Sequence, residues 1–267
     1  MPTATVPLRI IQITDLHLKA TPGSRLWGVD VDAGLSAVLA RIQEKHPAPD
    51  FILATGDLVH DASPEGYVRI RKRLAQFNAP VYCLPGNHDV REEMERFLRS
   101  DGVSMPFVVN QGRWLLVFLD SVIPWGDGGR LRDTEIELLR YTLKVHPDTP
   151  TMICLHHQPI PVDSLWLDTM AVENGDKLMS LVNAFPQVQC VLFGHIHQLY
   201  DRVINNKRFL ATPSTCIQFT PLQADFGVDN IAPGFRWLVL LPDGGILTGI
   251  LRLDRLPDAI DLRSRGY

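Results

Sequence analysis

Seven of the nine histidines in this 267-residue chain stand at, or just beyond, the ends of five short apolar runs. They are His17, His60, His88, His156, His157, His195 and His197, and Asp15, Asp57 and Asn87 also stand at run ends. Imidazole, carboxylate and amide groups can bind metal ions, and the first two can transfer protons. Histidines that merely fill a core would not collect at one edge of a sheet, so this grouping predicts a functional site.

Each motif taken alone also has a purely structural interpretation. Asp-x-His at 15–17 and Gly-Asp at 56–57 are both compatible with turns after strands. Gly-Asn-His-Asp at 86–89 is more distinctive, whereas Gly-His-x-His at 194–197 is compatible with a ligand pair or with a hydrogen-bonded pair on a strand edge. The succession of these motifs, each closing an apolar run, favours chemistry over packing.

The apolar runs predict the strands that position these residues. They span 10–14, 51–55, 81–84, 152–155 and 188–193, and runs of this length are typical of strands covered on both faces. The spacing of apolar residues between them predicts helices at 34–42, 67–77, 92–98, 133–145 and 174–185, with Asp133 and Asn174 as N-caps. Alternating strands and helices predict an α/β fold whose ligands gather at the carboxyl ends of the strands.

The remaining strand-like segments predict antiparallel pairs and therefore mixed sheets. A turn at 110–112 divides the segment 107–120, a polar turn at 205–207 precedes 208–212, and Pro-Asp-Gly-Gly at 242–245 interrupts 237–253. The sequence contains no repeat, low-complexity tract or flexible linker. We therefore expect a single domain over 1–267, with a polar tail from about 257.

The composition is that of an ordinary globular protein, with 45% hydrophobic residues, 21% charged residues and a net charge of −4. Nucleic-acid-binding proteins usually carry a basic excess, so we expect no nucleic-acid partner. Neither a signal peptide nor an apolar run of the ~20 residues that a membrane span needs is recognisable, so we expect no membrane partner. The four widely spaced cysteines are interpreted as buried free thiols of a cytoplasmic protein.

The order of the motifs over residues 10–200 resembles that of the calcineurin-like metallophosphoesterases. Further stretches resemble one subgroup, the class III cyclic-nucleotide phosphodiesterases, and lie at 12–15, 84–89, 164–168, 210–216, 231–234 and 266–267. The resemblance implies a four-layer α-β-β-α sandwich with two mixed β-sheets. It also implies hydrolysis of 3′,5′-cyclic AMP to 5′-AMP, which would lower cyclic AMP signalling.

The resemblance implies two metal sites that share Asp57, because a carboxylate has two oxygens and can hold one ion on each. The first site would use Asp15, His17, Asp57 and His197, and the second Asp57, Asn87, His156 and His195. Nitrogen and oxygen ligands suit Fe, Mn, Zn or Co better than Ca or Mg, and we expect Fe, Mn or both. A metal-bridging hydroxide would be the nucleophile, and the cluster would keep a charge of about +1 that attracts a phosphodiester.

The resemblance leaves His88 without a role as a metal ligand. We expect it to stabilise the phosphoryl oxygens and to protonate the departing O3′. Asp89 has two interpretations, either orienting His88 or capping the helix after the loop. The expected substrate contacts are Asn87, His88, His197 and His17.

Several other residues keep more than one interpretation. His157 follows a ligand on a strand, so its side chain should point the other way and support the structure. His60 either lines the substrate cleft or, as we favour, is a solvated loop residue. Trp166 either stacks on a purine or packs its loop. His46 and His146 each precede a proline near a helix end, where we assign no function beyond the helix dipole.

Two alternatives to cyclic AMP hydrolysis remain. An enzyme of the same fold could act on other phosphodiesters or on nucleotide monoesters, since a dianionic monoester is attracted even more strongly. A scaffold that has lost its metals is disfavoured, because all seven ligand positions carry competent side chains. Among partners, cyclic AMP is the expected substrate, and a homodimer is the assembly considered.

Overall fold

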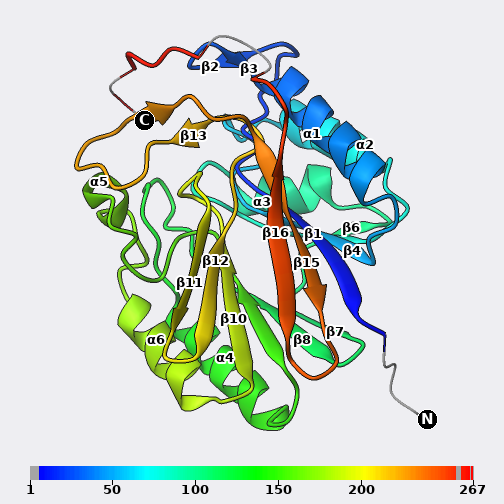
Figure 1. The fold of residues 1–267 in the computed structure, drawn as a ribbon, viewed down its shortest axis with the longest axis vertical. Coiled ribbons are helices and arrows are strands. Elements are labelled where there is room, and N and C mark those ends of the chain that lie inside the picture. Colours follow the sequence, from blue (N-terminus) through cyan, green and yellow to red (C-terminus); the bar gives the residue numbers. More distant parts are fainter. Residues whose placement is uncertain (1–5, 257–259, 265, 267) are drawn as a thin grey trace.

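The computed structural model describes residues 6–256, 260–264 and 266, so five residues of the predicted polar tail (257–259, 265 and Tyr267) lie outside the described residues. Two six-stranded sheets form the centre of the fold (Figure 1). The first has the order β16-β15-β1-β4-β5-β6. Its strands are β1 (Leu8–Ile13), β4 (Phe51–Thr55), β5 (Val81–Leu84), β6 (Val103–Ser104), β15 (Gly234–Leu240) and β16 (Ile246–Arg252).

The second sheet has the order β11-β12-β10-β9-β8-β7. Its strands are β7 (Val108–Gln111), β8 (Trp114–Phe118), β9 (Thr151–Cys154), β10 (Val188–Phe193), β11 (Tyr200–Ile204) and β12 (Lys207–Ala211). Both sheets are mixed: β1, β4, β5 and β6 run parallel, as do β8, β9, β10 and β12, while the remaining pairs are antiparallel. The five predicted central strands and the three antiparallel pairs are confirmed.

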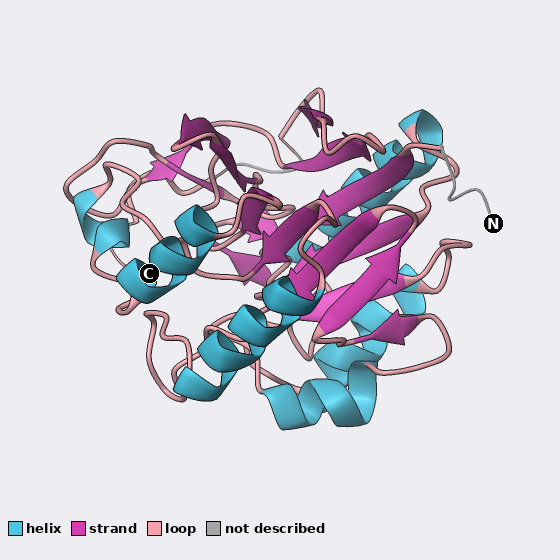
Figure 2. Cartoon of the chain, turned by 90° about the horizontal axis from the view of Figure 1, so that it is seen from below, coloured by secondary structure: helices cyan, strands magenta, loops and turns pink. Residues whose placement is uncertain are grey.

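Helices cover the outer faces of the paired sheets (Figures 1 and 2). They are α1 (Val31–Lys45) and α2 (Pro64–Leu74) on one side, and α4 (Asp133–Val145) and α6 (Gly175–Ala184) on the other. Shorter elements are α3 (Arg91–Glu93), the π-helix η1 (Met94–Leu98), α5 (Leu165–Asp168), β2 (Arg25–Leu26), β3 (Val29–Asp30), β13 (Gln218–Phe219) and β14 (Val228–Asp229). The predicted four-layer α-β-β-α sandwich is confirmed.

Alternation along the central strands explains why their sequences are mostly apolar. In β4, Phe51 and Leu53 belong to the apolar cluster between the two sheets, while Ile52 and Ala54 belong to the cluster that includes the helices. Successive strand residues point to opposite faces, so a strand packed on both faces needs apolar side chains at every position. The rigid pair of sheets then fixes where the loops at the strand ends begin.

The helix starts differ from the predictions in two places. Asp133 is the first helical residue rather than the N-cap, which is Arg132, and no side-chain cap bond forms there. Asn174 does occupy an N-cap, but its side chain makes no cap bond. Instead its amide accepts from the Leu131 N–H (3.0 Å) and donates to the Leu131 carbonyl (2.8 Å), because a tertiary partner competes for the same polar group. The predicted helix 92–98 is divided into α3 and η1.

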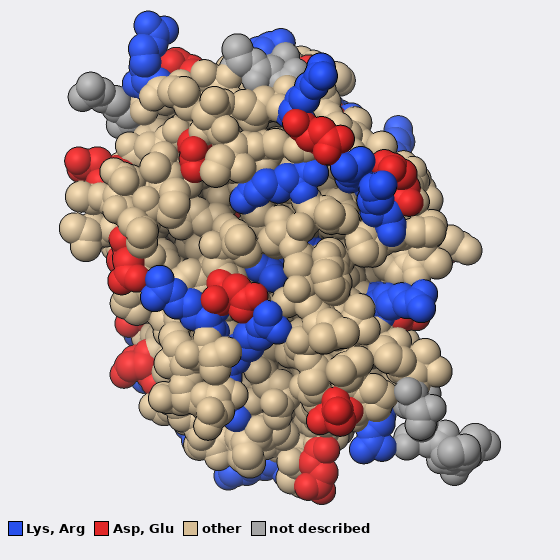
Figure 3. All heavy atoms as spheres, in the orientation of Figure 1, with Lys and Arg blue, Asp and Glu red and all other residues tan. Residues whose placement is uncertain are grey.

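Charged side chains of opposite sign lie beside one another on the face shown in Figure 3. The ion pairs of the structure include Arg208 with Asp201 at 2.8 Å and Arg130 with Glu173 at 2.9 Å. Exposed pairs of this kind contribute about 0–1 kcal/mol each, so the fold rests on its two apolar clusters. In the described part of the chain, no helix is both long and apolar enough to cross a membrane.

Candidate metal centre

The predicted site residues meet at the carboxyl-terminal edge of both sheets. The first sheet supplies Asp15 and His17 after β1, Asp57 after β4, and Asn87 and His88 after β5; the second supplies His156 and His157 after β9, and His195 and His197 after β10. Both aspartates and the four histidines expected as ligands are at most 1% exposed. So many ionisable groups buried together require either hydrogen bonds or a bound cation to compensate for lost hydration.

His17 and His197 form one half of the centre with Asp15. The Nε2 atoms of the two histidines lie 3.1 Å apart, and His197 Nε2 lies 3.4 Å from Asp15 Oδ1. These three side chains bring one donor atom each to within 4.8 Å of one another. The geometry therefore offers one carboxylate oxygen and two imidazole nitrogens to a single point.

His156, His195 and Asn87 form the other half. His156 Nε2 lies 3.2 Å from Asn87 Oδ1 and 4.0 Å from Asp15 Oδ1. The ring of His195 stands edge-on to that of His156, with ring centroids 5.1 Å apart. Residues that are about 40 to 110 positions apart in the chain thus converge, as expected where strand ends of two sheets meet.

Asp57 lies between the two halves. Its Oδ2 atom is 3.8 Å from His17 Nε2 and 3.3 Å from His156 Nε2, whereas Oδ1 accepts a hydrogen bond from the His88 N–H at 2.9 Å. Oδ2 is thus the oxygen with close contacts to histidines of both halves. A carboxylate oxygen has two lone pairs, so Oδ1 can accept this hydrogen bond and still bind an ion, and the expectation of one oxygen for each ion stays a prediction.

Three of the four histidines have their Nδ1 atoms held by acceptors outside the centre. His156 Nδ1 lies 2.8 Å from the Thr55 carbonyl, His197 Nδ1 lies 3.0 Å from the Ile217 carbonyl, and His17 Nδ1 lies 3.1 Å from His60 Nδ1. A carbonyl acceptor fixes the proton on Nδ1 and leaves the lone pair on Nε2, which is the arrangement typical of metal-binding histidines. The Nε2 atoms accordingly point toward the shared carboxylates.

His195 differs, because neither of its ring nitrogens has a hydrogen-bond partner among the described residues. Its side chain is 1% exposed, and only its backbone N–H is bonded, to both Asp15 carboxylate oxygens at 3.1 and 3.2 Å. A buried imidazole without a partner is destabilising, and a cation bound to one nitrogen would compensate. The donor set of imidazole, carboxylate and amide therefore fits bound metal ions.

Five of the seven expected ligands adopt backbone conformations that non-glycine residues rarely occupy. Asp15, His17, Asp57, His195 and His197 have φ angles between 49° and 65°. Each such residue costs on the order of 1–2 kcal/mol, so the surrounding packing must impose these conformations. Strain concentrated on residues of one cluster is typical of functional sites.

The glycine that precedes each of three ligands is required by close packing. A Cβ atom at Gly56 would lie 2.3 Å from His156 Nδ1, one at Gly86 would lie 2.2 Å from Asp57 Oδ1, and one at Gly194 would lie 2.2 Å from Thr14 Oγ1. The Gly-Asp, Gly-Asn and Gly-His pairs of the sequence motifs therefore have a steric cause.

Burial and mutual interactions shift the pKa values of these groups in opposite directions. Burial acts to raise the pKa of Asp57, but His156 and His88 outweigh it and hold that pKa well below its usual value. Burial acts to lower the pKa of His156, whereas Asp57 and Asp15 raise it to about 9. Burial lowers the pKa of His17 and of His195 well below the usual range. Without metal, Asp57 and Asp15 therefore favour the protonated form of His156.

Asp89 takes neither of its two predicted roles. Its carboxylate, 4% exposed, accepts hydrogen bonds from the Leu58, Val59 and Gly86 N–H groups at 3.0–3.1 Å and from the Tyr67 hydroxyl at 3.1 Å. The helix that follows begins after Val90 without a side-chain cap. The bonds from Leu58 and Val59 tie the loop after β4 to the loop after β5, and the bond from Tyr67 adds α2. The sequence could not reveal this, because three of the four donors are backbone groups.

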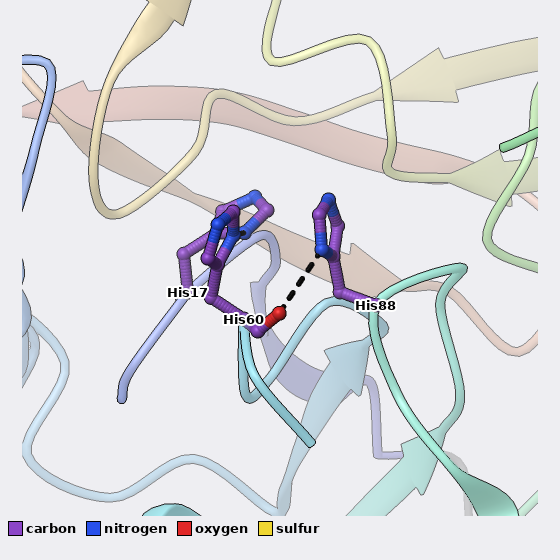
Figure 4. Close-up of side chains that lie close together, drawn as sticks. All are labelled: His17, His60 and His88. Carbon is purple, nitrogen blue, oxygen red and sulfur yellow. Dashed lines mark hydrogen bonds between the residues drawn. The ribbon is translucent and has the colours of Figure 1, made fainter. Parts of the chain in front are cut away.

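His60 is not the solvated loop residue that we favoured. Its ring stacks on that of His88, with centroids 4.4 Å apart and planes 23° apart, and contacts His17 (Figure 4). Burial, followed by His88, lowers its pKa to about 4. The backbone carbonyl of His60 accepts a hydrogen bond from His88 Nδ1 at 3.2 Å, so His60 lies beside the centre.

The other uncertain residues follow the structural interpretations. His157 Nδ1 lies 2.8 Å from Ser121 Oγ, and its ring packs beside that of His195, with centroids 4.6 Å apart. Trp166 packs on Phe219 and Phe226, with centroids 5.0 and 5.2 Å away. His46 and His146 are the C-caps of α1 and α4.

Phe219 is a contributor that the sequence did not indicate. Its ring lies 4.1 Å from that of His197, and the two planes are 9° apart. The contact holds the plane of a predicted ligand. A phenylalanine without a neighbouring motif carries no signal for this role.

Known proteins similar to this chain match it over most or all of its length. The profile of the calcineurin-like phosphoesterases matches residues 8–199. The 3′,5′-cyclic adenosine monophosphate phosphodiesterase CpdA of Pseudomonas aeruginosa is 39% identical, covering 100% of this chain and 97% of the relative; the CpdA of Escherichia coli K12 is 40% identical, covering 97% and 95%. A dimetal phosphatase from Danio rerio shares the fold, with a TM-score of 0.64, 11% identity and coverage of 91% and 98%.

Proposed function

The chain belongs to the calcineurin-like phosphoesterases, and we propose that it is a phosphodiesterase that hydrolyses 3′,5′-cyclic AMP to 5′-AMP with two bound metal ions. The observation that carries this proposal is 39% and 40% identity, over nearly the whole chain, to relatives named as cyclic AMP phosphodiesterases. The convergence of the buried carboxylates and imidazoles supports it independently. Acting in the cytoplasm, the enzyme would lower cyclic AMP signalling.

We assign two metal sites to this chain. The first comprises Asp15, His17, Asp57 and His197, and the second Asp57, Asn87, His156 and His195. The Nε2 contacts around Asp57 Oδ2 support the shared role of this carboxylate. Because the ligands are nitrogen and oxygen atoms without a thiolate, we propose Fe, Mn or both, with Zn and Co as alternatives.

When bound, the ions would lower the pKa of a water molecule, so that hydroxide is available near neutral pH, and would place positive charge beside the phosphoryl group. We propose that Asn87, His88, His17 and His197 contact the phosphodiester. His88 would then act as the general acid for the departing O3′. Its Nδ1 donates to the His60 carbonyl, and its other ring nitrogen lies on the far side of the ring (Figure 4).

We propose that Asp89 supports catalysis indirectly. Two of the four hydrogen bonds that it accepts, from the Leu58 and Val59 N–H groups, hold the loop that carries Asp57 against the loop that carries Asn87 and His88. Burial and Asp57 raise its pKa to about 6. Asp89 is therefore a positioning residue that keeps the ligand loops in register.

The alternative activity is hydrolysis of other phosphodiesters or of nucleotide monoesters on the same fold. The cluster charge attracts any of these anions, so the choice among them lies with the loops around the centre. A metal-free scaffold is disfavoured, since the ligand positions carry competent side chains and His195 has buried nitrogens without protein partners among the described residues.

The experiment that tests this proposal compares wild-type protein and Asn87→Ala after metal removal and re-supply of Mn or Fe. We expect 5′-AMP to form from cyclic AMP only after metal is restored, and the variant to lose this activity. Cleavage of a nitrophenyl diester without cleavage of cyclic AMP would leave the metal centre in place but refute the substrate.

The role of His88 has a separate test. His88→Ala should slow cyclic AMP hydrolysis more than hydrolysis of a nitrophenyl ester, because the nitrophenolate leaves without protonation while the sugar alkoxide does not. Equal losses on both substrates would exclude His88 as the general acid.

A further inference from the structure

Three histidines meet at the rim of the first metal site (Figure 4). The ring of His60 lies between two residues that the proposed function uses, since its Nδ1 is 3.1 Å from His17 Nδ1 and its face stacks on His88. His17 itself is also in edge contact with His88, at 5.0 Å between ring centroids. Neither the expected ligand set nor the expected acid includes His60.

Backbone pairing places His60 there with little freedom. Beyond β1 and β4 the two segments of the chain continue side by side. The His17 N–H donates to the Asp57 carbonyl (2.9 Å) and the Leu18 N–H to the Leu58 carbonyl (3.1 Å). The His60 N–H in turn donates to the Leu18 carbonyl (2.7 Å). The segment that contains Asp57 therefore also places His60 beside His17. Because these hydrogen bonds fix the backbone of His60, its ring can act as an acceptor in a fixed position.

The contact between the two Nδ1 atoms constrains where the protons lie. A hydrogen bond between two nitrogens needs one that is protonated and one that is not. If His17 binds metal through Nε2, its own proton must be on Nδ1, so His60 Nδ1 must be the acceptor. The proton of neutral His60 then lies on Nε2.

We propose that His60 is a positioning residue of the first metal site: its ring accepts the His17 Nδ1–H and so directs His17 Nε2 to the metal, while its ring face and carbonyl hold His88. This inference rests on the proposed function and deepens it. The carbonyls of Thr55 and Ile217 serve His156 and His197 in the same way, but only His17 relies on a side chain that substitution can remove. That difference makes the inference testable.

Three substitutions separate the two contacts of His60. His60→Asn keeps an acceptor at the position of Nδ1 but removes the ring; His60→Phe keeps a ring to stack on His88 but removes the acceptor; His60→Ala removes both. The backbone carbonyl that binds His88 Nδ1 is present in all three. His146→Ala, at the far end of α4, is the matched control.

The first readout is metal affinity, measured by competition with a chelator and independent of activity. Loss of an outer hydrogen bond to a ligand typically weakens metal binding about 10–100-fold. We therefore expect the affinity for one ion, the one at the first site, to fall by this factor in His60→Phe and His60→Ala. His60→Asn should stay close to wild type. The second readout is the ratio of cyclic AMP to nitrophenyl ester turnover, which should fall in His60→Asn and His60→Ala and be retained in His60→Phe.

The outcomes separate this inference from the proposed function. Wild-type affinity for both ions in His60→Phe, or equal losses in His60→Asn and His60→Phe, would overturn the inference while leaving the enzyme assignment intact. Thermal unfolding of each variant checks the fold, and the Asn variant supplies a decisive result if the others unfold. Failure of the wild-type protein to bind two ions would instead refute the proposed function.

Discussion

In the first half of the centre both histidines are held by the protein, whereas in the second half one of them is not. His17 and His197 each place Nδ1 against an acceptor, and Phe219 also stacks on His197. In the second half His156 is bonded to the Thr55 carbonyl, but neither ring nitrogen of His195 has a hydrogen-bond partner among the described residues.

This difference indicates that the two ions depend on the fold to different degrees. Ligands oriented by outer contacts lose little freedom when a cation binds, so the first half is preorganised. The second half also has a proton to displace from His156, whose pKa is raised to about 9, while His17 is neutral. We therefore expect the first ion to bind more tightly at neutral pH.

Asp57→Asn should have the largest effect, because it removes the charge that both halves share. We expect loss of both ions and a fall in kcat of more than about 10³-fold, beyond the ~10²–10³ seen when one oxyanion donor is removed. Metal analysis and cyclic AMP turnover measure this. Asn87→Ala is the control, because it should weaken the binding of the second ion only. Retention of two ions in Asp57→Asn would contradict the shared role of Asp57.

Gly56→Ala should selectively disturb the second half. Its Cβ would meet His156 Nδ1 at 2.3 Å, and a displacement of about 1 Å in a catalytic group can cost ~10²-fold in rate. Gly102→Ala is the control, because Gly102 also has a positive φ but its Cβ would meet nothing within 4 Å. If the two variants lost activity equally, backbone strain rather than the collision with His156 would be responsible.

The pH dependence of metal binding should differ between the halves. The proton on His156 must leave before Nε2 can bind, so the second ion should bind about tenfold more weakly for each pH unit below about 9. The low pKa of His17 predicts no such dependence for the first ion near neutral pH. Calorimetric titrations at several pH values test this, and identical pH slopes for the two ions would remove the distinction.

Phe219→Leu should have the smallest effect and act on the first half. Leucine is smaller than phenylalanine, so the substitution leaves a small cavity and should cost about 1–2 kcal/mol, less than the ~3–5 kcal/mol of a Phe→Ala change, which denaturant unfolding would measure. Loss of the stacked ring should slightly lower the affinity for the first ion and leave the affinity for the second unchanged. A lower affinity for the second ion alone would contradict the division of the centre into halves.

The strands and the ligand types could be predicted because both are local signals. Runs such as 51–55 are apolar at nearly every position, which indicates burial on two faces, and each is followed by a residue with a polar group suited to metal binding. The helix caps were less predictable. Asn174 satisfies Leu131 instead of its own helix, since a partner 43 residues away competes with the local bond.

The sequence by itself determined which side chains reach the strand ends, while the ligand set and the sandwich that carries it were implied by the resemblance to a known family. Only the tertiary structure decided which nitrogen of each histidine faces inward, where Asp89 binds and what His60 and Phe219 contact. The partners responsible are backbone carbonyls, amides and rings separated by as many as 101 residues in sequence, as for His156 and Thr55. Because every residue carries the same backbone groups, their positions depend on the path of the folded chain and not on residue type.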